Sequence, residues 1–257
     1  MSVYKVSGDK TPEFYNKINE NNIRGKLGYL PIKCVLKDGR YAEIDLMNES
    51  EIDKCLVLFN DMLEGGQSWP FDAESFTKNE YITYYCSYVS IVLRLEDDKS
   101  VILGTTYVKP NFPGRCSHIC NGGFITNKKY RGLGVATILG RIYLRIAKDL
   151  GYRASLFNLV FANNIPSIRV WEKLGFKRSG VIKNAAKLKG IDGYIDAYQY
   201  YYDLTTYNHT KYPLNTIFQY DASKLNTNKG INTKSPVIII ISILVSILIF
   251  YIMQYYS

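Results

Sequence analysis

The chain has 257 residues, a formal net charge of +9 and a hydrophobic content of 47%. This apolar content suffices for one sizeable folded domain with appendages. The charge is compatible with nucleic acid, a membrane surface or an anionic cofactor as the partner. Because no basic face interleaved with aromatic residues and no zinc-finger spacing accompanies the charge, we expect no nucleic-acid partner.

The N-terminus and the cysteines narrow the class of protein further. The first 22 residues are polar and contain no apolar core, so they do not read as a secretory signal. The five cysteines are odd in number and irregularly spaced, which favours reduced thiols in the cytosol over a disulfide framework. Cys116, His118 and Cys120 resemble half of a zinc site, but no second ligand pair follows, so we expect no metal.

The first predicted elements are a hairpin and a helix. Residues 31–47 alternate around Asp38-Gly39, which is a hairpin turn signal between two strands. Asn48 is placed to cap a helix that runs through Glu64, and Gly65-Gly66 is placed to end it.

The middle of the chain predicts further strands. Residues 67–88 are rich in aromatic side chains and predict one or two short helices, whereas residues 89–95 and 101–108 predict strands. A proline-rich loop then leads into a strand that carries Asn121 and Phe124. Gly122-Gly123 within this strand indicates a bulge or a close approach of the backbone by a ligand.

A strand, a glycine-rich turn and a helix follow one another up to Asp149. After Gly134, apolar residues recur at spacings of three and four, the stripe of a helix with one buried face. The glycines on either side of Leu133 leave the first amides of this helix uncovered, and such a helix start binds anions. A Walker loop and a dinucleotide loop are excluded, because Val135 follows Gly134 and Thr137 stands where a third glycine would be needed.

A second capped helix follows the next predicted strand, residues 154–161. Asn164 is a good N-cap, Pro166 fits the first turn and Gly175 is placed to end the helix. Two more strands are predicted over residues 177–182 and 194–203.

The two helix starts together resemble the signatures of GNAT-type N-acetyltransferases. Arg-x-x-Gly-x-Ala at residues 131–136 resembles the acetyl-CoA pyrophosphate loop, and residues 164–176 resemble the second signature, which ends in Gly-Phe. The resemblance implies an α/β (α+β) fold with a mixed, mostly antiparallel sheet flanked by helices, in which the cofactor enters where two central strands part. It implies acetyl-CoA as cosubstrate, bound by Phe124, Ile125, Arg131, Gly132, Leu133, Gly134, Val135, Ala136 and Asn164.

A narrower resemblance is to the L-azetidine-2-carboxylate (proline-analogue) N-acetyltransferases. It is carried by residues 103–105, 109–111 and 115–118, by Asn121, and by Phe157-Asn158-Leu159-Val160-Phe161. This resemblance implies that Asn121 and Asn158 hold the substrate carboxylate, since an amide donates two N–H groups without adding a charge. The alternative is that both asparagines only complete hydrogen bonds at strand ends.

The reaction implied is direct acetyl transfer to a small amine or imino acid. A backbone N–H near Phe124 or Ile125 would stabilise the oxyanion, and proximity would supply much of the rest. Asn164 is assigned both to the helix cap and to the cofactor or reacting centre. No obvious base lies in the motifs, so a water chain is expected to remove the amine proton. Trp171 stands where many relatives have a tyrosine acid, and indole cannot serve as that acid.

Two other functions remain open at this stage. One is a membrane-tethered protein acetyltransferase that modifies lysines or N-termini, and the other is a non-catalytic adaptor with the same fold. Retention of the pyrophosphate-loop residues and of Asn164 argues against loss of cofactor binding. A homodimer is also left open.

The C-terminal part predicts a linker and a membrane anchor. From Leu204 to Ser235 the composition shifts to polar residues with no sustained period, which is typical of a linker. Residues 237–253 carry no charge and would extend roughly 25 Å as a helix. We therefore predict an acetyltransferase domain over residues 1–208, a linker over 209–236 and a transmembrane tail anchor over 237–253. Lysines precede the anchor and no charge follows it, which places the domain on the cytosolic face of an intracellular membrane, the endoplasmic reticulum in preference to the mitochondrial outer membrane.

Overall fold

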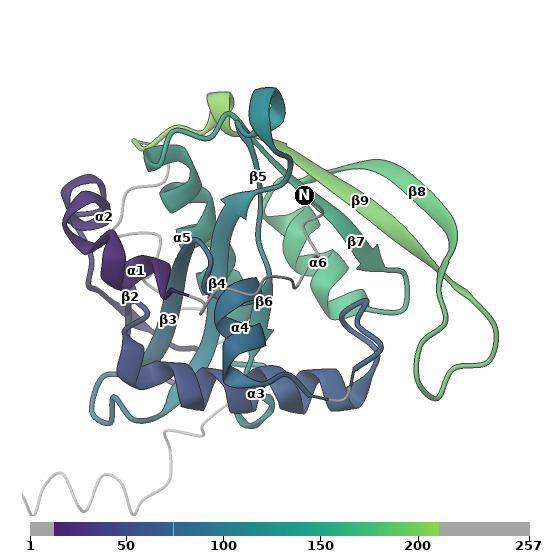
Figure 1. Cartoon of the computed structure of the whole chain (residues 1–257), viewed down its shortest axis with the longest axis horizontal. Helices are drawn as coiled ribbons and strands as arrows, with labels where there is room; N and C mark the ends of the chain where they lie inside the picture. Colours follow the sequence, from purple (N-terminus) through teal and green to yellow (C-terminus); the bar gives the residue numbers. More distant parts are fainter. Residues whose placement is uncertain (1–12, 74, 211–257) are drawn as a thin grey trace, which may run out of the picture. The chain divides into compact units, whose positions relative to one another are not determined.

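The computed structural model describes residues 13–73 and 75–210. Within these residues nine strands form one sheet in the order β1-β2-β3-β4-β5-β7-β9-β8, and β6 pairs with β4 next to β5 (Figure 1). Neighbouring strands are antiparallel except for β5 and β7, which are parallel. The predicted mixed, mostly antiparallel sheet flanked by helices is therefore confirmed.

The elements have the following bounds. The strands are β1 (Ile32–Val35), β2 (Tyr41–Leu46), β3 (Val89–Leu95), β4 (Ile102–Pro110), β5 (Ile119–Asn121), β6 (Phe124–Thr126), β7 (Ala154–Phe161), β8 (Lys177–Ala186) and β9 (Ile195–Asp203). The α-helices are α1 (Tyr15–Ile18), α2 (Glu20–Lys26), α3 (Ile52–Gly65), α4 (Lys78–Tyr85), α5 (Val135–Asp149) and α6 (Ile165–Lys173).

Two apolar cores lie on opposite faces of the sheet. The helices α5 and α6 bury their apolar stripes in the first core, to which Leu139, Ile142 and Trp171 belong. The helices α3 and α4 form the second core, which is rich in aromatic rings around Phe59. The separation follows from the pleat of the sheet, because successive side chains of a strand point to opposite faces.

The predicted hairpin and first helix are present, with shifted ends. Val35 pairs with Tyr41 across the Asp38-Gly39 turn. Asn48 and Glu51 form a capping box over a short 3₁₀ turn, after which α3 begins. The helix ends at Gly65, and Gly66 adopts a φ of 61°, a left-handed conformation that favours glycine.

The structure contains two helices that the sequence did not predict. Helices α1 and α2 have short polar sequences and bury only one side chain each, Asn16 in α1 and Ile23 in α2. The shift to polar composition begins at Leu204, inside the predicted domain (1–208), yet Leu204 is fully buried and Tyr207 is 6% exposed. Both residues belong to the first core, so the folded part continues to at least Tyr207.

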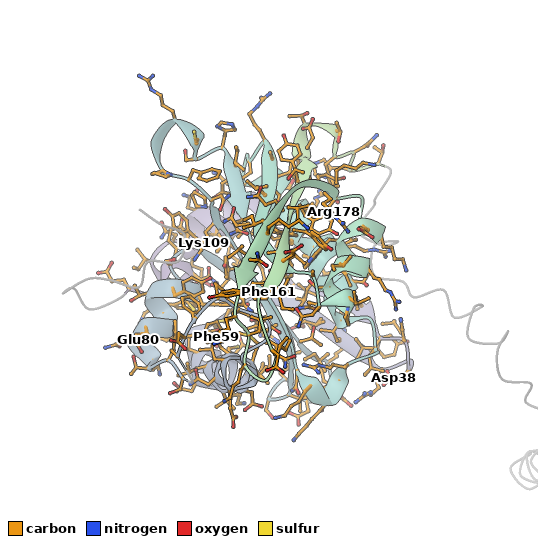
Figure 2. The ribbon with its side chains drawn as sticks, turned by 90° about the vertical axis from the view of Figure 1, so that its right-hand side faces the viewer. Asp38, Phe59, Glu80, Lys109, Phe161 and Arg178 are labelled. Atoms are coloured by element: carbon orange, nitrogen blue, oxygen red, sulfur yellow. The ribbon has the colours of Figure 1, made fainter. Side chains whose placement is uncertain are left out.

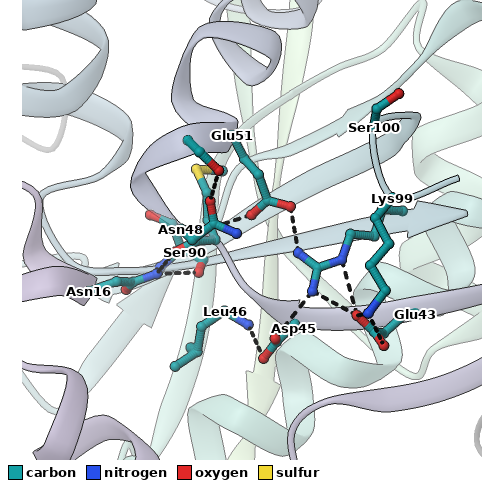
Figure 3. A network of polar contacts seen from close by, with 12 residues as sticks. Asn16, Glu43, Asp45, Leu46, Asn48, Glu51, Ser90, Lys99 and Ser100 are labelled. Carbon is teal, nitrogen blue, oxygen red and sulfur yellow. Dashed lines mark hydrogen bonds and ion pairs between the residues drawn. The ribbon is translucent and has the colours of Figure 1, made fainter. Parts of the chain in front are cut away.

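A buried network of charges ties β2 and β3 to the start of α3 (Figure 3). The Arg94 guanidinium lies 2.7 Å from Glu43, 2.5 Å from Glu51 and 3.3 Å from Asp45. Lys99 adds a second cation 3.0 Å from Glu43. Although burial alone would raise the pKa of Glu43, hydrogen bonds from Arg94 and Lys99 hold that pKa below its ordinary value.

The predicted linker (209–236) and membrane anchor (237–253) lie outside the described residues, apart from the first two linker residues. In residues 13–73 and 75–210, no helix has both the length and the apolar character needed to cross a bilayer. The described residues therefore do not test the anchor.

We expect Arg94→Met to lower the free energy of unfolding by about 3–5 kcal/mol, because it leaves buried carboxylates without their counter-charge. Urea unfolding measures this loss, and Lys33→Met is the control, since the ion pair of Lys33 with Glu96 lies on the surface. The Glu43 pKa is lower in the folded than in the unfolded chain, so its contribution is present above the unfolded pKa of about 4.5 and is lost as the pH falls. An Arg94→Met protein as stable as Lys33→Met would contradict this account.

Candidate functional site

The central strands part next to Asn121. Ile119 and Cys120 of β5 pair with Ala154 and Ser155 of β7, and the parallel pairing ends there. Further along, β6 pairs with β4 and, among the described residues, has no partner on its other side. Backbone groups of β6 that point away from β4 therefore face an unpaired edge toward β7, as the resemblance implied for a cofactor entry.

Gly122 and Gly123, where β5 ends and β6 has not begun, are enclosed by aromatic rings on both faces. A Cβ on Gly122 would lie 2.5 Å from the Tyr143 ring, and a Cβ on Gly123 would lie 2.3 Å from Trp69 and 2.6 Å from Tyr107. These distances are shorter than van der Waals contact, so packing requires glycine at both positions. From the sequence, a bulge or a close ligand was the expected reason for the two glycines. The structure supplies a third reason, which is packing against aromatic rings.

The hydrogen-bond pattern of β4 and β6 distinguishes Phe124 from Ile125. The amide of Tyr107 donates to the Gly123 carbonyl, and the amide of Asn127 donates to the Leu103 carbonyl. In an antiparallel ladder the amides of successive residues point to opposite sides. The Ile125 amide therefore points to β4, whereas the Phe124 amide points to the unpaired edge.

The glycine-rich turn leaves a row of amides uncovered. Gly132 and Gly134 have φ values of 82° and 87°, which only glycine adopts without strain. The first amide of this region that has a backbone acceptor is that of Ile138, which donates to the Gly134 carbonyl. No side chain caps α5. Among the described residues, the amides of residues 131–137 thus have no acceptor, and the turn has the character of an anion site.

The β1–β2 hairpin lies against this turn, which the sequence did not predict. The Lys37 amide donates to the Leu133 carbonyl at 3.2 Å. The Lys37 side chain comes within 3.6 Å of the position that a Cβ on Gly134 would take. A cation from a distant part of the chain is thereby held beside the uncovered amides, together with the exposed Arg131.

Asn164 forms the predicted helix cap. Its Oδ1 accepts a hydrogen bond from the Ser167 amide at 3.2 Å. The cap accounts for the oxygen, and among the described residues Nδ2 has no hydrogen-bond partner. Trp171 on the same helix is buried against Phe124 and Phe157, with ring centroids 4.5 and 4.7 Å apart.

The two predicted substrate asparagines have different surroundings. Asn121 is buried, and its Oδ1 accepts from the Gly122 amide at 2.8 Å. Asn158 exchanges two hydrogen bonds with Asn111, at 2.9 and 2.7 Å. Each amide still has an N–H with no acceptor among the described residues. Asn111 was not assigned a role from the sequence, although it follows β4 and is 1% exposed.

A buried lysine lies beside these asparagines, and sequence reasoning assigned it no role. Lys109 pairs directly with Asn121 across β4 and β5. Its Nζ lies 3.9 Å from the centroid of the Tyr84 ring and 4.5 Å from that of Tyr107. Burial lowers the pKa of Lys109 to about 7. The available signal was a lysine that is the one charged residue of β4.

The five cysteines are all unpaired, and Cys120 is buried with its Sγ 3.2 Å from the Tyr143 hydroxyl. Cys116 is exposed, and His118 contacts the Arg115 carbonyl. Residues 13–73 and 75–210 contain no cluster of three or more side chains that could hold a metal ion.

Comparison with known proteins identifies the same family that the sequence motifs resemble. Residues 57–176 match the model of the acetyltransferase (GNAT) family. The N-acetyltransferase aca1 of Schizosaccharomyces pombe is 42% identical over 185 residues, which cover 66% of this chain and 87% of that protein. An L-amino acid N-acetyltransferase of Escherichia coli is 34% identical over 85 residues, which cover 33% of this chain and 51% of that protein.

One solved structure has a similar fold. It is that of a putative acetyltransferase from Salmonella typhimurium with its cofactor acetyl-CoA. Its TM-score is 0.58 at 13% sequence identity, and the match covers 65% of this chain and 95% of that one. At this identity the likeness concerns the fold alone.

Proposed function

Because the chain belongs to the acetyltransferase (GNAT) family and is an N-acetyltransferase, we propose that it acetylates a small amine or imino acid that carries a carboxylate. L-Azetidine-2-carboxylate or a proline analogue is the proposed substrate, and acetyl-CoA is the donor. The observation that carries the proposal is the buried Asn121 at the point where β5 leaves β7. Its unoccupied N–H suits a carboxylate, since an amide donates without adding charge.

The proposed cofactor site combines the turn and the unpaired edge of β6. The amides of residues 131–137 would hold the diphosphate, because they lack acceptors and lie at the positive end of the α5 dipole. The Phe124 amide would bind the thioester oxygen, and Asn164 would contact the pantetheine or the reacting centre through Nδ2. The ladder favours Phe124 over Ile125 as the oxyanion donor.

The proposed chemistry is a single displacement. The neutral amine nitrogen attacks the thioester carbon, the oxyanion is stabilised by the Phe124 amide, and the C–S bond breaks. The departing thiolate takes the remaining proton of the amine, so no acid at the position of Trp171 is needed. Holding the two reactants together supplies a large part of the acceleration.

One relative supports a substrate with a carboxylate. The matched protein of Escherichia coli is described as an L-amino acid N-acetyltransferase. Amino and imino acids share an amine next to a carboxylate, which is the chemistry that Asn121, Asn111 and Asn158 are suited to bind. In a protein substrate the α-carboxylate lies only at the C-terminus, away from the N-terminal amine.

We expect Gly134→Glu to abolish measurable binding of acetyl-CoA, because a carboxylate at the helix start repels the diphosphate and the left-handed φ disfavours a side chain. Isothermal calorimetry with CoA and acetyl-CoA measures this. Gly151→Glu is the matched control, since Gly151 also has a positive φ of 94° and open space but follows the other end of α5. Equal affinities of the two variants would reject the cofactor site.

We expect the wild-type chain to release CoA with L-azetidine-2-carboxylate and proline analogues, and not with polyamines or peptides. Asn121→Ala should raise the KM for the carboxylate substrates about 10–100-fold, because it removes a hydrogen bond to a charged group worth about 1.5–3 kcal/mol. The exposed Asn163→Ala is the control. Turnover of peptides alone would instead support a protein acetyltransferase, and an unchanged KM would remove Asn121 from the substrate site.

We also propose that residues 237–253 anchor the chain by its tail to an intracellular membrane, with the acetyltransferase domain (1–208) on the cytosolic face and residues 209–236 as the linker. The uncharged run and the preceding lysines support this. We expect the chain to remain in the pellet after a carbonate wash of cell membranes. Val245→Arg, at the centre of the run, should release it, because a central charge costs about 2.5–3.5 kcal/mol. Val57→Arg on the exposed side of α3 is the control, and a soluble wild-type chain would exclude the anchor.

A further inference from the structure

Lys109 is a buried amine that lacks an acidic partner among the described residues. It is 6% exposed. In Figure 2 it lies toward the middle of the view, whereas Asp38 and Glu80 lie at the margin. Its Nζ donates to the Tyr84 carbonyl at 2.8 Å. No carboxylate of residues 13–73 and 75–210 forms an ion pair with it, in contrast to Arg94 with its three acidic neighbours. A buried ammonium without a counter-ion is costly, so the neutral amine is favoured.

The sheet places this amine on the same face as the asparagines of the proposed substrate site. Lys109 and Asn121 are direct partners across β4 and β5, and directly opposed residues point to the same face. Asn111 follows Lys109 by two positions and is bonded to Asn158. One amine and three amides are therefore gathered where β5 leaves β7.

The groups that face Lys109 carry no charge, so an anionic ligand can change the protonation state of this lysine. The helix α4 contributes the Tyr84 phenol ring, the residue after α4 is Cys86, and β4 itself contributes Tyr107. Burial raises the pKa of Cys86 to about 12, so this thiol is neutral at pH 7. On the side of β5, Asn121 carries no charge. With its own pKa near 7, Lys109 exchanges between amine and ammonium at neutral pH.

Resting on the proposed function, we infer that Lys109 accepts the proton of the substrate's ammonium group and, once charged, pairs with the substrate's carboxylate. The substrate arrives as a zwitterion and meets a neutral amine. One proton moves from the substrate nitrogen to Nζ of Lys109, which leaves a neutral nucleophile and an ion pair between Lys109 and the carboxylate.

The step balances without a further reactant. The neutral amine attacks the acetyl carbon, an N–C bond forms and the C–S bond breaks, and the second amine proton passes to the thiolate to give CoA. Lys109 returns its proton to water after the acetylated product leaves. The carboxylate thus supplies the counter-charge that the fold omits, and an amine without a carboxylate cannot stabilise the charged lysine.

The pH profile of turnover tests the base. For the wild-type chain we expect kcat/KM to rise with pH through an apparent pKa near 7. Lys109→Met should lower kcat/KM at pH 7 about 100–10,000-fold, the usual contribution of a general base, and should move the rise toward the pKa of a free amine, about 10. Lys109→Arg keeps a cation that cannot accept the proton, so kcat should fall while KM changes by no more than a few-fold.

A binding measurement that requires no turnover tests the ion pair. Tetrahydrofuran-2-carboxylate has the shape and carboxylate of an imino acid but no amine. Calorimetry at pH 8 in buffers of different ionisation heat should show that the wild-type chain takes up close to one proton on binding it, because the carboxylate raises the pKa of Lys109. Lys109→Met should take up none, and the surface variant Lys33→Met should behave as wild type.

The outcomes separate this inference from the proposed function. Two results would reject the role of Lys109 and leave the acetyltransferase assignment intact. One is that Lys109→Met turns over carboxylate amines with the same rise of kcat/KM with pH as the wild-type chain. The other is that the wild-type chain binds tetrahydrofuran-2-carboxylate without taking up a proton. Binding with proton uptake but no turnover of any carboxylate amine rejects the proposed substrate class and retains the ion pair. Absence of both binding and turnover rejects both. Urea midpoints close to that of the wild-type chain ensure that the variants are folded. The pH profile and the proton uptake of the wild-type chain test the inference even if a variant does not fold.

Discussion

The pairing of β4 with two different strand segments along one edge is the constraint on which the site depends. β4 holds β6 over its first part and β5 over its last part, and only β5 continues the sheet to β7. The strand that contains both segments must therefore turn at Gly122-Gly123. Everything proposed for the reaction lies around that turn, because it removes one neighbour from β6 and leaves peptide groups without a strand partner.

The aromatic rings on both faces maintain this turn. Tyr143 on the α5 face and Trp69 and Tyr107 on the α4 face occupy the space that side chains at Gly122 and Gly123 would need. The Tyr143 hydroxyl is in turn bonded to Ser155 at 2.7 Å, which ties α5 to β7 at the last pair of the parallel ladder. The place where the strands part is thus fixed by packing on either side of the sheet as well as by the ladder itself.

The two buried basic side chains among the described residues, Arg94 and Lys109, have different surroundings. Arg94 is matched by carboxylates of β2 and the α3 entry, and its network lies among elements that serve the scaffold. Lys109 has only a carbonyl and two ring faces, and burial holds its pKa far below that of an exposed lysine. A matched cation rigidifies a fold, whereas an unmatched one is responsive to an anionic ligand.

Local sequence patterns determined the elements whose signals lie within a few residues of one another. The spacing after Gly134 specified α5, the Asn164 cap specified α6, and the glycines at 132 and 134 specified a turn that leaves amides uncovered, since each depends on short-range geometry. The tertiary structure alone decided that Lys37 lies on the glycine-rich turn, that Asn111 pairs with Asn158, and that Lys109 stands beside Asn121 without an acid. These contacts join segments far apart in the chain, and the burial that changes the chemistry of Lys109 arises only when the whole sheet and its helices have packed around it.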